Sequence, residues 1–149
     1  MARSYRLGLA RRLVNVLVRR LVRLGLAGPH TYLLSVSGRR SGRLYTTPVI
    51  LVENGDRFLV APYGAVGWVR NIRAGGRATL SRRNRREEIT VRELAAAESA
   101  PVLREYLRRV RVVRPFFDAS PDAPLEALAR EAEQHPVFRI QTTTQASRQ

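Results

Sequence analysis

The sequence predicts a mainly β protein of the α+β class, a closed antiparallel barrel of six strands with helices packed outside it. Two observations indicate this fold. From residue 31 onward, short runs rich in β-branched and aromatic residues follow one another, with turn residues between them. A long stretch with helical periodicity then separates the fifth run from a sixth near the C-terminus, so the last strand returns to the sheet.

Turn residues join two pairs of these strands into hairpins. Residues 53–56 contain an Asn-Gly pair, which is typical of a tight hairpin turn. The run Arg82-Arg83-Asn84-Arg85 closes a second hairpin in the same way. The expected strands are 31–36, 44–52, 57–61, 77–81, 87–94 and 136–141.

Three helices are expected between or after the strands. Residues 67–74 suit a two-turn helix that ends at Gly75-Gly76, where a glycine can adopt the left-handed conformation of a helix cap. Residues 95–110 and 124–134 show helical patterns, and an irregular crossing over 115–124 connects them. Residues 142–149 are polar and are expected to be frayed.

The N-terminal segment, residues 1–28, is expected to be a basic amphipathic helix, with its clearest periodicity over 3–26. This stretch carries seven arginines and no acidic residue, and no apolar run in it is long enough to cross a membrane. Two interpretations remain open at this point. The helix makes peripheral contact with an anionic membrane, or it packs on its own domain, where it could also act as a lid.

Length and composition bound the class of protein. A chain of 149 residues is the size of one ordinary domain, so we expect a single domain over 1–149. The chain has no cysteine, which fits a reducing compartment such as the cytoplasm, with contact at the inner face of the membrane left open. The net charge of +15, with arginine as every basic residue, favours an anionic partner without choosing among nucleic acid, lipid and small molecules.

The segment 37–43, Ser-Gly-Arg-Arg-Ser-Gly-Arg, is the strongest candidate for a binding site. Two glycines bracket paired arginines and a serine between two strand-like runs, so the loop can turn sharply and present guanidinium groups and backbone N–H groups. Arginine suits phosphate and carboxylate groups because its planar donors engage two oxygens at once. A solvated basic hairpin tip is the plainer interpretation of the same residues.

Residues that could catalyse a reaction without a cofactor are few. His30 and His135 lie at opposite ends of the chain and have no ligand spacing, so no metal site is expected. Ser41 is misplaced for a nucleophile elbow, and its setting is strand to strand rather than strand to helix. We therefore expect a cofactor to carry the chemistry, and the catalytic residues stay unassigned.

An ordered series of motifs resembles the deazaflavin (coenzyme F-420)-dependent nitroreductase family, which has a flavin-reductase-like split β-barrel fold. The series is 38–43 (Gly-Arg-Arg-Ser-Gly-Arg), 47–49 (Thr-Pro-Val), 55–57 (Gly-Asp-Arg), 63–64 (Tyr-Gly), 68–72 (Trp-Val-Arg-Asn-Ile) and 74–76 (Ala-Gly-Gly). The resemblance implies a six-stranded split barrel. It also implies hydride transfer from reduced F-420 to an electron-poor small molecule, namely a quinone, an enone or a nitro compound.

The resemblance also implies where the coenzyme binds. The phosphate and oligoglutamate tail would lie near the loop arginines, and the deazaflavin ring would lie beside the second strand and below the helix at 67–74. Tyr63 and Tyr106 are candidates for the substrate pocket. The implied coenzyme contacts are Arg39, Arg40, Ser41, Arg43, Thr47, Pro48, Ala61, Pro62, Tyr63, Gly64, Trp68 and Asn71.

Other functions remain as alternatives to F-420-dependent catalysis. A barrel of this kind could hold FMN, haem or a lipid without F-420 chemistry, because a fold does not fix a function. A basic nucleic-acid-binding module is less favoured, because the aromatic residues do not interleave with the loop arginines. The oligomeric state is left open.

Overall fold

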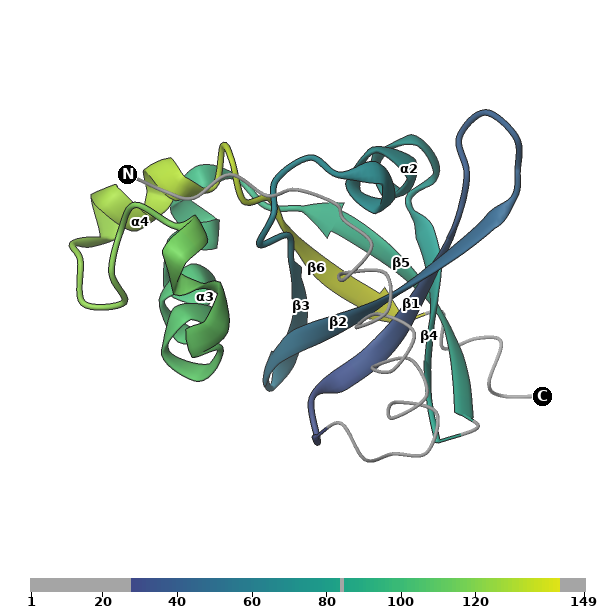
Figure 1. Cartoon of the computed structure of the whole chain (residues 1–149), viewed down its shortest axis with the longest axis horizontal. Coiled ribbons are helices and arrows are strands. Elements are labelled where there is room, and N and C mark those ends of the chain that lie inside the picture. The colour runs from purple at the N-terminus through teal and green to yellow at the C-terminus, as the bar shows by residue number, and fades with distance from the viewer. Residues whose placement is uncertain (1–27, 84, 143–149) are drawn as a thin grey trace.

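The computed structural model describes residues 28–83 and 85–142, and these residues form the expected closed antiparallel barrel of six strands (Figure 1). The strand order around the barrel is β1-β2-β3-β6-β5-β4, and β4 pairs with β1 to close it. Every neighbouring pair is antiparallel. The strands are β1 (Thr31–Ser37), β2 (Leu44–Asn54), β3 (Asp56–Val60), β4 (Arg77–Arg82), β5 (Arg85–Glu93) and β6 (Val137–Thr142).

The Asn-Gly turn joins β2 to β3 as predicted. Gly55 adopts a φ of 104°, which a residue with a side chain takes only with strain. The turn brings Asn54 opposite Asp56 and fixes the register of both strands. Residues 1–27 of the expected N-terminal helix and residues 143–149 of the expected tail lie outside the described residues, so both stay predictions, whereas Thr142, expected in the frayed tail, is the last residue of β6.

Alternating apolar side chains fill the barrel interior. Leu34 on β1 lies beside Leu80 on β4 in the register, and both are almost fully buried. Phe138 enters the same cluster from β6. At one end of the barrel, Val69 and Ile72 of helix α2 (Gly67–Gly75) pack into this cluster and close it.

Helix α2 (Gly67–Gly75) ends as predicted. Gly76 has a φ of 70°, and its N–H donates to the carbonyl of Ile72 at 2.7 Å. This left-handed cap lets the chain reverse directly into β4. Because the helix closes the barrel end, its first turn lies beside the loop between β1 and β2 (Figure 1).

A second core lies between the outer face of the barrel and helices α3 (Ala96–Arg109), η1 (Arg111–Phe116) and α4 (Leu125–Glu131). Val52, Val60 and Val137 point outward from β2, β3 and β6 into this core. Figure 1 shows α3 and α4 side by side at one side of the barrel, away from α2. The helices predicted outside the barrel are therefore confirmed.

The structure differs from the predicted elements in two places. The helix expected over 124–134 ends at Glu131, and turns follow it. The N–H groups of Glu133 and Gln134 donate to the carbonyls of Arg130 and Glu131, three residues back, so the chain tightens into turns after Glu131. The crossing expected to be irregular over 115–124 begins inside the 3-10 helix η1. Within the described ranges, no helix is long and apolar enough to span a membrane.

Candidate functional site

The loop 38–43 between β1 and β2 is braced by its own hydrogen bonds. The N–H of Gly38 donates to the carbonyl of Arg43 at 2.7 Å, and the N–H of Gly42 donates to the carbonyl of Gly38 at 2.9 Å. The Ser41 hydroxyl accepts from the N–H of Arg43 at 3.1 Å. The arginines therefore project from a loop whose backbone groups largely satisfy one another.

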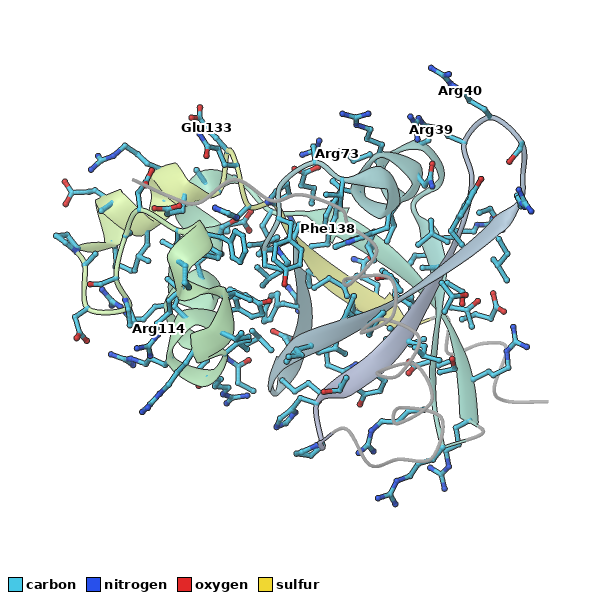
Figure 2. All side chains as sticks on the ribbon, viewed as in Figure 1. Arg39, Arg40, Arg73, Arg114, Glu133 and Phe138 are labelled. Atoms are coloured by element: carbon cyan, nitrogen blue, oxygen red, sulfur yellow. The ribbon has the colours of Figure 1, made fainter. Side chains whose placement is uncertain are left out.

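Arg39 and Arg40 leave this loop in different directions. Asn71 Oδ1 accepts two hydrogen bonds from Arg39, one from its backbone N–H at 3.1 Å and one from its guanidinium NH1 at 2.8 Å. Figure 2 shows Arg39 turned toward α2, while Arg40 extends from the loop tip. Arg39 therefore fastens the loop to the helix, and Arg40 is exposed to an incoming ligand.

A pocket of about 420 Å³ lies between the loop, the start of β2 and the first turn of α2. Its volume falls in the ordinary range of small-molecule sites, about 300 to 1,000 Å³. No acidic residue is among those that line it, so an anion meets no opposing carboxylate there. The lining residues are Gly38, Arg39, Arg40, Ser41, Tyr45, Thr46, Thr47, Val66, Gly67, Trp68 and Asn71.

Half of the predicted coenzyme contacts line this pocket. They are Arg39, Arg40, Ser41, Thr47, Trp68 and Asn71, which come from three separate segments of the chain. The Trp68 ring is half-buried, and its centroid lies 6.1 Å from that of Phe138 in the barrel core. The loop 38–43 and helix α2, which carries Trp68 and Asn71, therefore meet at one cavity.

The other predicted contacts are placed outside the lining. Ala61 is fully buried, and its methyl group belongs to the barrel core. Pro48 lies opposite Leu33 in the strand register, and Arg43 contributes its backbone to the loop. The segment Pro62-Tyr63-Gly64 runs toward η1, where the Tyr63 ring meets Phe116 edge-on at 4.9 Å between centroids. Their contact with a coenzyme stays a prediction.

Tyr45, Thr46, Val66 and Gly67 also line the pocket, although the sequence did not single them out. Alternate residues of a strand point to the same face, so Tyr45 shares a face with Thr47. This spacing could have predicted that Tyr45 lines the same pocket as Thr47. Tyr45 is 49% exposed, and a Cβ placed on Gly38 would lie only 2.9 Å from its Cε2 atom. The missing side chain at Gly38 therefore leaves room for the Tyr45 ring.

Tyr106 does not line the pocket. It is buried in the helical core, where its ring centroid lies 6.4 Å from that of Phe117. Burial, with a smaller contribution from the charge of Tyr63, raises the pKa of the Tyr106 hydroxyl far above its ordinary value. Tyr106 is therefore a neutral core residue, and the proposal that it contacts substrate finds no support in this geometry.

His135 and Glu131 form a buried pair behind the barrel. The His135 ring stacks on Phe117 at 3.7 Å between centroids, and its Nδ1 lies 3.3 Å from the carbonyl oxygen of Ala61. Glu131 accepts from the N–H of Ala119 through Oε2 at 2.6 Å. Within 28–83 and 85–142, no group of three or more His, Asp or Glu residues could hold a metal ion.

Comparison with known proteins identifies the family. The family model described as F-420H(2)-dependent quinone reductase matches residues 10–119. The chain therefore belongs to the F-420H(2)-dependent quinone reductase family. It is an F-420-dependent oxidoreductase, and coenzyme F-420 is its cofactor. No curated protein matches the sequence significantly.

Solved structures share the fold at low sequence identity. The F-420-H(2)-dependent reductase FDR-A is 19% identical, with a TM-score of 0.53 over 75% of this chain and 94% of that one. A protein described as a domain-swapped dimer is 18% identical, with a TM-score of 0.56 over 89% and 99% of the two chains. The haem storage protein HutZ from Vibrio cholerae is 11% identical, with a TM-score of 0.51 over 85% and 88%.

Proposed function

We propose that the pocket between the loop 38–43 and α2 binds coenzyme F-420, and that the reduced coenzyme is used there to reduce a quinone. The observation that carries this proposal is the convergence of Arg40, Thr47 and Trp68 on one cavity in a chain of this family. The quinone is favoured over an enone or a nitro compound because the matching family is described as a quinone reductase.

The residues present fit the two chemically different parts of the coenzyme. The loop end of the pocket offers Arg39 and Arg40 to phosphate and carboxylate groups. Trp68, Tyr45 and Val66, which also line the pocket, offer aromatic and apolar surface to a planar ring. Gly67 adds no side chain to the cavity, and a Cβ there would meet nothing within 4 Å, which leaves space for a ring close to the backbone.

The chain's own residues position the ligands and limit the access of water. Reduced deazaflavin supplies a hydride, and a proton from water completes the hydroquinone. Asn71 holds the loop in place through Arg39, and half-buried Trp68 covers one wall of the cavity. In this proposal the reduction rate depends on orientation and on exclusion of water, because no lining residue is an acid or a histidine.

A ligand titration tests the coenzyme site. Trp68 is the only tryptophan in the sequence, so its fluorescence reports directly on this pocket. We expect F-420 to quench it with saturation near one equivalent and FMN to quench it weakly. The variant Arg108→Gln, which removes an exposed charge on α3 far from the pocket, should bind F-420 as the wild type does. Tighter binding of FMN than of F-420 would overturn the coenzyme assignment.

Turnover distinguishes the substrate classes. Under anaerobic conditions, reduced F-420 should be oxidised faster by a naphthoquinone than by a cyclic enone or a nitroimidazole at equal concentration. A preference for the nitro compound would indicate that the protein is a nitroreductase instead. The haem alternative has little support, because neither described histidine lines the pocket and each lies against another protein group.

We also propose that residues 3–26 contact an anionic membrane and that residues 1–149 form one domain in the cytoplasm. The support is the seven arginines and the apolar periodicity of that segment, which lies outside the described residues. The full chain should sediment with phosphatidylglycerol vesicles at low salt, and deletion of the segment should abolish this. Equal sedimentation of both proteins would exclude the lipid role.

A further inference from the structure

A second cavity lies at the opposite end of β1 from the loop 38–43. It has a volume of about 690 Å³ and opens beside the hairpin between β4 and β5, at the far end of the barrel from α2 (Figure 1). None of its lining residues belongs to the proposed coenzyme pocket. It is lined by Tyr32, Arg57, Leu80, Arg82, Arg83, Arg85, Arg86 and Glu87.

The acidic groups at this end of the barrel already have partners. Arg57 NH1 and NH2 donate to Glu87 Oε1 and Oε2 at 3.0 and 2.5 Å, and this pair spans the barrel mouth because β3 and β5 are not neighbours. Glu53 accepts from the Tyr32 hydroxyl at 3.1 Å and lies 2.7 Å from His30 Nδ1. A carboxylate therefore neutralises Arg57, whereas no carboxylate among the described residues pairs with Arg82, Arg85 or Arg86 beside it.

The hairpin arginines, Arg82, Arg85 and Arg86, lie in positions that lower the stability of the sheet. Arg82 lies directly opposite Arg85 in the register of β4 and β5, and like charges in that position destabilise a sheet. Arg82 donates to the carbonyl of Gly28 at 2.9 Å, which fixes its direction without neutralising its charge. Arg85 and Arg86 are exposed. A bound polyanion would relieve this repulsion.

The other walls of the cavity restrict the class of anion. Among the described residues, Tyr32 is the only aromatic residue that lines the cavity. The guanidinium of Arg82 lies 5.9 Å from the centroid of the Tyr32 ring, and the Tyr32 hydroxyl donates to Glu53. The hydroxyl and the ring of this one aromatic group are therefore already in contact with other side chains. The exposed large apolar side chains of the described residues, such as Leu44 and Val112, do not line this cavity.

We infer that this cavity is a second anion site, which binds a linear oligophosphate such as triphosphate independently of the coenzyme. Phosphate oxygens match the bidentate geometry of guanidinium groups, and a short chain of phosphates can engage Arg82, Arg85 and Arg86 together. A concave site suits such a compact ligand better than it suits a flat membrane surface.

Calorimetric titration of the full-length protein with sodium triphosphate tests this inference. We expect saturable binding at one site, weakened as salt is raised. The double variant Arg85→Gln/Arg86→Gln should bind at least tenfold more weakly, because both side chains line the cavity. The control Arg108→Gln/Arg111→Gln removes the same charge from exposed positions outside it and should bind as the wild type does.

Three outcomes would overturn the inference. Equal weakening in the hairpin and control variants would mean that only net charge matters. If single-stranded DNA or phosphatidylglycerol vesicles depended on Arg85 and Arg86 while triphosphate did not, the hairpin would be a macromolecular contact instead. Saturating triphosphate should also leave quenching of Trp68 by F-420 unchanged, and competition between them would place both ligands in one site.

Discussion

Asn71 holds Arg39 through a single oxygen, which accepts both the backbone N–H and the guanidinium NH1 of that residue. The contact joins residues 32 positions apart in the sequence and fixes the loop 38–43 to α2. The family resemblance implies that both residues contact the coenzyme. The structure adds that they depend on each other.

Replacing Asn71 with alanine should loosen the loop and weaken F-420 binding about tenfold. It removes one neutral and one charge-assisted hydrogen bond, so the free energy of unfolding should fall by about 1 to 3 kcal/mol. Asn71→Asp keeps an acceptor for Arg39 and should restore most of that stability. Denaturant unfolding and fluorescence titration measure the two effects, and unchanged affinity in folded Asn71→Ala would remove Asn71 from the site.

Arg40→Ala should separate coenzyme binding from stability. The exposed Arg40 side chain has no packing role, so the free energy of unfolding should change by less than about 0.5 kcal/mol. Loss of a charge-assisted contact of about 1.5 to 3 kcal/mol should weaken F-420 binding about ten- to a hundredfold. A truncated deazaflavin without phosphate and tail should bind the variant and the wild type alike. Equal losses for both ligands would indicate a collapsed loop.

Gly38→Ala should displace the Tyr45 ring. The added Cβ would lie 2.9 Å from Tyr45 Cε2 and 3.3 Å from the carbonyl oxygen of Arg43, which is backbone and can move little. We expect weaker F-420 binding and a stability loss of about 1 kcal/mol. Gly75→Ala is the control, because a Cβ there meets nothing within 4 Å and alanine favours a helix. If Gly38→Ala binds F-420 normally, Tyr45 is not a wall of the coenzyme site.

Stability should fall in mild acid because of His135. Burial lowers the pKa of the His135 imidazole below its ordinary 6.5, although Glu131, with its Oε1 3.6 Å away, opposes the shift. Above pH 6.5 both folded and unfolded chains hold the ring neutral, so this contribution is fully present. As the pH falls from there toward the lower pKa of the folded protein, the unfolded chain gains the proton first and stability is lost.

The variant His135→Phe isolates this effect, because phenylalanine can still stack on Phe117 but does not titrate. Unfolding measured between pH 7.5 and 5 should show a steeper loss for the wild type than for the variant. Parallel curves would mean that other groups cause the acid sensitivity.

The barrel was predictable because its signals are local. The Asn-Gly turn, the runs of β-branched and aromatic residues in the strands, and the glycine cap after α2 each act within a few residues. The family motifs, which are also local in the sequence, predicted the identity of the coenzyme and the loop that binds it. The pairing of Arg39 with Asn71 was not readable, because a contact across 32 residues depends on how α2 closes the barrel.

The direction of individual side chains explains why some residues of the pocket were predicted wrongly or missed. Ala61 is one of the coenzyme contacts that the resemblance implies, yet its methyl group lies in the barrel core, and Tyr106 lies in the helical core. Tyr45 was overlooked although it lines the pocket. Sequence spacing shows which residues share a strand face, but only the closed barrel shows which face meets a cavity.

Several acidic residues of this basic chain pair with arginines. Glu87, Glu93 and Asp56 each lie within 3.0 Å of a guanidinium nitrogen, so their charges are cancelled locally. The arginines that remain produce a positive field that an approaching anion meets before it touches the protein. The association rate constant for F-420 should therefore decrease steeply with ionic strength, whereas its dissociation rate constant should change little.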